Sequence, residues 1–79
     1  MTMKARVNLQ IQAPEVRVVS EDGTDLGLFP REQALEMVRL RGEDLVEIGP
    51  DAVPPVCQMI QYGKYQYRLQ EARKGRSGA

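Results

Sequence analysis

The chain has 79 residues, 42% of them hydrophobic, and its 11 acidic side chains balance its 11 basic ones. This length allows one small domain, and this composition argues against a disordered segment. Because the sequence has no histidine and a single cysteine, it excludes a Cys/His zinc site, an internal disulfide and a histidine base. No apolar run approaches the roughly 20 residues that cross a bilayer. We therefore expect a cytoplasmic, monomeric domain that has no cofactor, metal or membrane contact and is not an enzyme.

The zero net charge conceals a polarised sequence. Residues 20–51 hold nine acidic residues against three arginines, whereas residues 64–79 hold five basic residues against Glu71. This asymmetry predicts that the C-terminal end faces a polyanion, while the acidic part stays away from it or meets a basic partner. The alternative is a solvated surface with a basic tail.

The first 13 residues are predicted to form an arm that ends in an extended segment. Apolar residues alternate there with polar ones, which is typical of an edge strand. The apolar positions are Val7, Leu9 and Ile11. Pro14 then interrupts the pattern, because proline cannot donate to a strand ladder.

A hairpin is predicted next. Residues 16–19 form one strand, and residues 25–29 form the returning strand. Residues 21–24 make the turn, where two acidic residues tolerate turn geometry and Gly23 can take a positive φ.

The following segment is predicted to be a helix from about Pro30 to Arg41. Proline suits the first turn of a helix, and Gly42 is the expected stop. The apolar residues Ala34, Leu35 and Val38 share one face, which should cover the sheet.

Two more strands and a terminal helix complete the chain. We expect strands at residues 45–48 and 56–60, and a helix from about residue 61 onward. This order predicts an α+β roll with the first helix across one face of the sheet, followed by a C-terminal helix. We divide the chain into an arm (1–13), a globular core (14–61) and a helix that begins a linker (62–79).

The candidate binding residues lie mainly in the C-terminal helix. Aromatic rings can stack on bases, and lysine or arginine can pair with phosphate oxygens. The candidates for RNA or ribosome contact are Arg17, Tyr62, Lys64, Tyr65, Tyr67, Arg68, Arg73 and Lys74. For Tyr62 and Tyr65 the alternative is packing of the helix onto the sheet, and for Arg17 it is a surface salt bridge. Cys57 is predicted to be a small core residue.

Six short segments follow one another along the chain: Pro14-Glu15-Val16-Arg17, Gly23 with Leu26-Gly27, Arg31-Glu32-Gln33-Ala34-Leu35, Asp44-Leu45-Val46-Glu47-Ile48, Pro54-Pro55-Val56-Cys57 and Tyr62-Gly63-Lys64-Tyr65. Any one segment is a weak signal, but the ordered series at this spacing is highly specific. From about Asn8 to Tyr67, the chain resembles the N-terminal domain of bacterial translation initiation factor three.

The resemblance implies a small α/β roll with one helix packed on a four-stranded mixed sheet, and no enzymatic activity or cofactor. It also implies binding to the small ribosomal subunit, through ribosomal RNA and proteins, and help in selecting initiator tRNA and the start codon. In the family, a separate C-terminal domain supplies most of the subunit affinity and blocks subunit joining.

The chain departs from the family pattern at several positions. Gln58 and Gln12 stand where the family usually or often has arginine, and Gln61 stands where it has an acid. The two lost cations should weaken phosphate contacts at these positions. The C-terminal domain is absent, and the lysine-rich linker is reduced to residues 73–76. We expect a domain excised from a longer factor, since the resemblance stops at a domain boundary; the alternative is a naturally short relative.

Two functional hypotheses follow. The first is a ribosome-binding module of the initiation factor, in which Lys64, Arg68 and Arg17 meet RNA phosphates or a ribosomal protein. The second is a stand-alone interaction module with the same roll, in which Glu32 and Glu36 face a basic protein partner.

Overall fold

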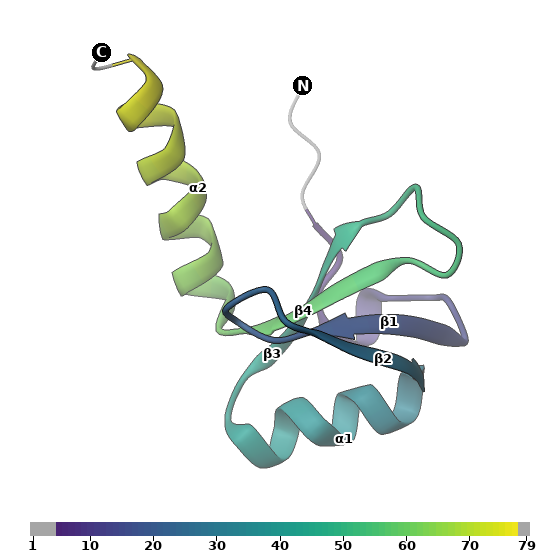
Figure 1. The fold of residues 1–79 in the computed structure, drawn as a ribbon. Helices are drawn as coiled ribbons and strands as arrows, with labels where there is room; N and C mark the ends of the chain where they lie inside the picture. The colour runs from purple at the N-terminus through teal and green to yellow at the C-terminus, as the bar shows by residue number, and fades with distance from the viewer. Residues whose placement is uncertain (1–4, 78–79) are drawn as a thin grey trace.

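The computed structural model describes the backbone of residues 5–77 and the side chains of residues 5–71 (Figure 1). A 3₁₀ helix is followed by two strands, a helix, two strands and a final helix. The elements are η1 (Asn8–Gln10), β1 (Glu15–Val19), β2 (Asp25–Pro30), α1 (Arg31–Arg41), β3 (Asp44–Gly49), β4 (Val56–Ile60) and α2 (Tyr62–Ser77). The predicted order of the strands and the two α-helices is confirmed.

The four strands form one mixed sheet in the order β2-β1-β4-β3. β1 pairs antiparallel with β2 and parallel with β4, and β3 pairs antiparallel with β4. The predicted α+β roll with a four-stranded mixed sheet is therefore confirmed. The parallel pair at the centre needs a long crossover, and the chain between β1 and β4 supplies it through β2, α1 and β3.

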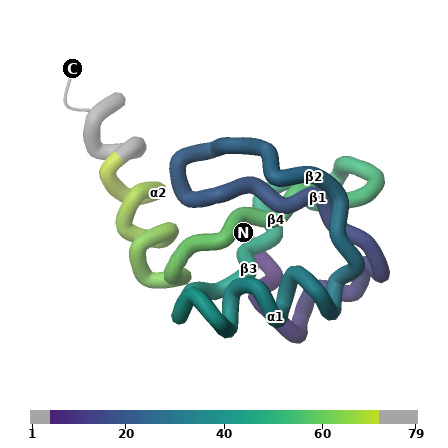
Figure 2. The backbone as a smooth tube through the Cα atoms, turned by 60° about the horizontal axis from the view of Figure 1, so that its bottom comes forward, coloured from purple at the N-terminus to yellow at the C-terminus, as the bar shows by residue number. Residues whose placement is uncertain are grey.

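The hydrophobic core lies between α1 and one face of the sheet (Figures 1 and 2). Ala34 and Val38 on α1 are buried, as their shared helical face predicts. They belong to one cluster with Ile11, Val16, Val18, Leu45, Cys57 and Met59. Gly42 ends α1 at φ +68°, a left-handed conformation that glycine adopts without a steric penalty.

The arm differs from the predicted edge strand. Val7 makes a single antiparallel bridge to Val46 on β3, and the chain then turns into η1. Asn8 causes the turn: its φ is +53°, its side-chain amide donates to Asp44 Oδ1 at 3.0 Å, and its Oδ1 accepts from the Leu45 N–H at 2.8 Å. As a result Leu9 is 86% exposed, whereas Ile11 is fully buried in the core.

The second helix, α2, projects from the end of β4 and does not cover the sheet (Figure 1). The loop between β1 and β2 lies beside the first turns of α2 in both views (Figures 1 and 2). In the described part of the chain, no helix is both long and apolar enough to span a membrane.

Candidate nucleic-acid interface

The start of α2 is fixed by a carboxylate from β3. The Tyr62 N–H donates to Asp44 Oδ2 at 2.9 Å, so a negative charge satisfies a free donor at the positive end of the helix dipole. The other carboxylate oxygen accepts from Asn8. Asp44 therefore ties the arm and α2 to the same strand. Sequence reasoning missed this role, because the two partners lie 36 and 18 residues away.

The three tyrosines of α2 have different environments. The rings of Tyr62 and Tyr65 stack, with centroids 6.2 Å apart and planes 21° apart, and both side chains are half-buried. Tyr67 is 61% exposed. Tyr62 and Tyr65 thus pack on each other, on a helix that projects from the sheet, whereas Tyr67 presents its ring to solvent. Which of the tyrosines contacts RNA stays a prediction.

The two candidate cations of the first turns, Lys64 and Arg68, converge on one acidic residue. Lys64 Nζ lies 2.8 Å from Glu21 Oε2, and Arg68 Nη2 lies 2.9 Å from the same oxygen. Arg68 Nη1 also donates to the backbone carbonyl of Glu21 at 3.3 Å. The hydrogen bond from Lys64 lowers the pKa of Glu21, and the charge of Arg68 adds to this effect. We name the set of Glu21, Lys64 and Arg68 the hairpin clamp.

The loop that presents Glu21 is held by its own side chains. Asp22 accepts from the Ser20 hydroxyl and, at 3.1 Å, from the Thr24 N–H. These two bonds lower the pKa of Asp22 from 3.8 to about 2. Gly23 has φ +91°, as the turn prediction requires. The sequence carries no signal that Glu21 meets α2.

Gln58 supports the same loop from β4. Its Nε2 donates to the backbone carbonyls of Ser20 at 3.2 Å and Glu21 at 3.1 Å. At this position the resemblance leads one to expect arginine. Here a neutral amide makes the contacts, so the loop is held without adding a cation.

Arg17, which was also predicted to bind, lies outside the clamp. Arg17 is half-buried on β1 and pairs with Asp25 at 2.8 Å across the hairpin, so the salt-bridge alternative holds for it. The side chains of Arg73 and Lys74 lie outside the described residues. Their role stays a prediction.

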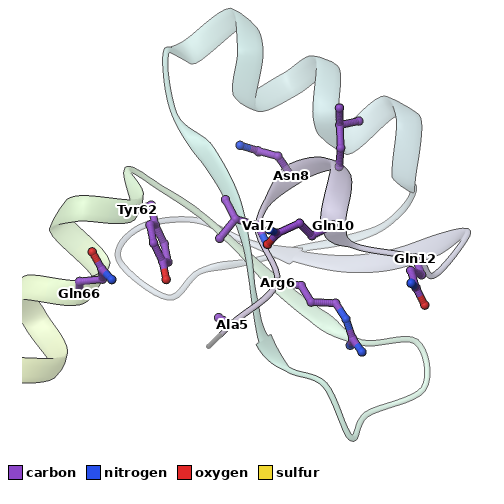
Figure 3. Close-up of a pocket in the computed structure, with 9 residues that line it drawn as sticks. Ala5, Arg6, Val7, Asn8, Gln10, Gln12, Tyr62 and Gln66 are labelled. Atoms are coloured by element: carbon purple, nitrogen blue, oxygen red, sulfur yellow. The ribbon is translucent and has the colours of Figure 1, made fainter. Parts of the chain in front are cut away.

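A groove runs between the arm and α2 (Figure 3). Tyr62 and Gln66 form its α2 side, and Val7, Gln10 and Gln12 are among the arm residues that line it. Arg6, at the same groove, pairs with the buried Glu47 at 3.0 Å. Apolar and amide side chains make up most of the described lining, and Arg6 is its one charged residue, so the groove has no concentrated charge.

The thiol of Cys57 is held in its protonated form. Cys57 is fully buried, and burial beside Glu47 raises the pKa of its thiol to about 12, which suppresses the nucleophilic thiolate. Among the residues whose side chains are described, no group of three or more acidic or cysteine ligands could hold a metal ion.

Comparison with known proteins places this geometry in a family. The family described as "Translation initiation factor IF-3, N-terminal domain" matches residues 7–76. The translation initiation factor IF-3 of Aquifex aeolicus is 49% identical over 73 residues, which are 87% of this chain and 42% of that protein. The factor of Fusobacterium nucleatum is 47% identical, over 90% of this chain and 40% of that protein. The factor of Myxococcus xanthus is 55% identical over 78% of this chain and 25% of its own length.

This chain therefore spans well under half the length of these curated relatives. The match over residues 7–76 includes η1, the four strands and α1 in full, and all of α2 except its last residue. The chain belongs to the family of N-terminal domains of translation initiation factor IF-3.

Proposed function

We propose that this chain binds the small ribosomal subunit during translation initiation and assists the selection of initiator tRNA and the start codon. In this proposal, α2 is the contact surface. Lys64 and Arg68 meet phosphates of ribosomal RNA, and the exposed ring of Tyr67 extends the surface. The block of subunit joining would come from a separate C-terminal domain, as in the family that the sequence resembles.

The observation that carries the proposal is the family membership, together with an exposed basic face on a helix that projects from the roll. Lys64 and Arg68 are four residues apart, so they share one side of α2 with Tyr67. Both cations keep about half of their side-chain surface in water. A polyanion can therefore reach them without unfolding the domain.

Binding of the chain to purified small ribosomal subunits at several salt concentrations tests the proposal. Lys64→Ala and Arg68→Ala should each weaken binding and should each flatten the plot of log K against log salt by about one unit. An intact initiation factor IF-3 should compete with the wild-type chain. If both variants keep the wild-type slope, these residues are not in the interface.

Arg39→Ala is the matched control. Arg39 is an exposed cation that pairs with Glu36, but it lies on α1, away from the proposed surface. Its loss changes the net charge by as much as Lys64→Ala or Arg68→Ala does, but it should leave the slope of log K against log salt unchanged. Charge reversal at Glu32 and Glu36 separates the alternative hypothesis, because a basic protein partner on α1 would make that change matter.

A further inference from the structure

The hairpin clamp joins segments that are distant in the sequence. Glu21 lies 43 residues from Lys64 and 47 from Arg68. By contrast, Glu36 and Arg39 are neighbours on one helix, where the helical repeat alone brings such pairs together. The clamp therefore depends on how the β1–β2 loop is placed against α2.

The geometry at Glu21 is that of a bound anion. One oxygen, Oε2, receives both Lys64 Nζ and Arg68 Nη2, and the adjacent backbone carbonyl receives the second Arg68 nitrogen. Lysine and arginine bind a phosphate oxygen with the same donors and at similar distances. A phosphate and the Glu21 carboxylate therefore cannot occupy this position together.

The loop is also held by contacts outside the clamp. Asp22 bonds to Ser20 and Thr24, and Gln58 bonds to the loop backbone from β4. The Glu21 side chain can thus leave the two cations while the hairpin stays folded. Both partners of Glu21 are exposed, and surface ion pairs contribute little free energy, so replacing the carboxylate by a phosphate costs little.

We propose that Glu21 is an internal competitor for RNA: its carboxylate occupies the place between Lys64 and Arg68 that a phosphodiester oxygen takes on binding. This inference rests on the proposed function, because it uses the same two cations. Glu21 attenuates RNA affinity and makes it less dependent on salt. An RNA partner is favoured over an acidic protein because the exposed Tyr67 ring lies beside the cations, where a base can stack.

Glu21→Gln tests this competition, because it keeps the size and polarity of the side chain and removes the charge. We would titrate a fluorescein-labelled single-stranded RNA with the whole chain and follow anisotropy. At low salt, the variant should bind about threefold to tenfold more tightly than wild type, and the gain should shrink as salt screens the pair.

Glu36→Gln is the matched control, since it removes one exposed acid that also pairs with an arginine. It should change affinity by less than about twofold, the effect of net charge alone. Circular dichroism should show the same fold for both variants. If Glu21→Gln binds no more tightly than Glu36→Gln, the internal competition is wrong.

A third set of variants separates this inference from the proposed function. Lys64→Ala/Arg68→Ala should weaken RNA binding, and adding Glu21→Gln to it should bring no gain. If the double variant binds like wild type, the proposed interface itself fails. If the double variant weakens binding but Glu21→Gln alone brings no gain, the interface stands and the competition is overturned.

Discussion

The two helices of this domain are attached to the same sheet by different forces. α1 is held by apolar burial: Ala34 and Val38 pack into a cluster that contains fully buried residues of three strands. α2 is held by charge and hydrogen bonding, through Asp44 at its first residue and Glu21 at its first turns. Salt does not screen apolar burial, because no charges are involved, whereas it weakens exposed ion pairs. The comparison suggests that α1 serves stability and that α2 is available for exchange with a partner.

The largest expected effect comes from breaking the apolar layer under α1. Leu45→Ala empties a fully buried site in the core cluster and should cost about 3 kcal/mol of unfolding free energy. Urea unfolding followed by circular dichroism measures this loss. Leu40→Ala is the control: it removes the same atoms from a side chain that is 71% exposed, and it should change stability by less than about 0.5 kcal/mol. Equal losses would contradict the assignment of the core.

A smaller effect is expected from Asp44→Ala. The change removes the acceptor of both the Asn8 amide and the Tyr62 N–H, and should cost about 1–2 kcal/mol. Unlike Leu45→Ala, it should also speed amide hydrogen exchange in the first turn of α2. Asp44→Asn keeps one oxygen acceptor without the charge. Its free energy of unfolding should therefore lie between those of wild type and Asp44→Ala. A loss confined to global stability, with no change in exchange at α2, would show that Asp44 does not hold this helix.

Much of the fold follows from local patterns, whereas the attachments of α2 do not. The face of α1, the stop at Gly42 and the hairpin turn at Gly23 each depend on residues a few positions apart, and all three predictions are confirmed. The prediction of an edge strand in the arm was wrong. The alternation of apolar and polar residues at 7–11 favours a strand, but Asn8 takes a left-handed turn and its side-chain amide bonds to β3. Alternation alone cannot show which force prevails.

Of the candidate site, the sequence predicted the cations on α2 but not the residues that they contact. Lys64 and Arg68 were identified from the type of residue and its helical spacing, and the structure brings them together. Glu21 and Asp44 were not identified as partners of α2, and Gln58 was noted only as a departure from the family pattern. Each of the three acts on a segment at least 18 residues away. Contacts of that range depend on the crossover of the sheet and not on any short motif. The ribosomal contacts themselves stay a prediction.

Salt should distinguish the two attachments without any mutation. As salt rises from about 50 mM to 1 M, the Debye length shrinks severalfold, so the hairpin clamp should loosen. The side-chain ¹⁵N resonances of Lys64 and Arg68 should move, while the methyl resonances of core residues such as Val18 and Leu45 stay in place. Core resonances that move as far as those of the clamp would remove the distinction drawn between the two helices.

The smallest expected effect concerns the loop that presents Glu21, and it depends on pH. The pKa of Asp22 is lowered from 3.8 to about 2 in the folded chain, first by the Ser20 hydroxyl and then by the Thr24 N–H. A carboxyl whose pKa is lowered by folding stabilises the folded state above its unfolded pKa, and this contribution is lost as pH falls through the folded value. The stability difference between wild type and Asp22→Asn should therefore be constant above about pH 5 and should shrink between about pH 4 and 2. Urea unfolding of both chains across this range measures it.

Ser20→Ala sharpens the same test. It removes the largest cause of the lowered pKa, so the pH range in which the Asp22 contribution disappears should move up toward the ordinary value of an aspartate. If the range does not move, the Ser20 hydroxyl does not hold this carboxylate. The loop would then owe its shape to its backbone bonds, in which the Ser20 N–H donates to the Thr24 carbonyl at 2.8 Å, and to Gln58. In either case the loop that presents Glu21 keeps bonds of its own and to Gln58, besides the one from Arg68 to the Glu21 carbonyl. The Glu21 carboxylate can therefore exchange for a phosphate while the hairpin stays folded.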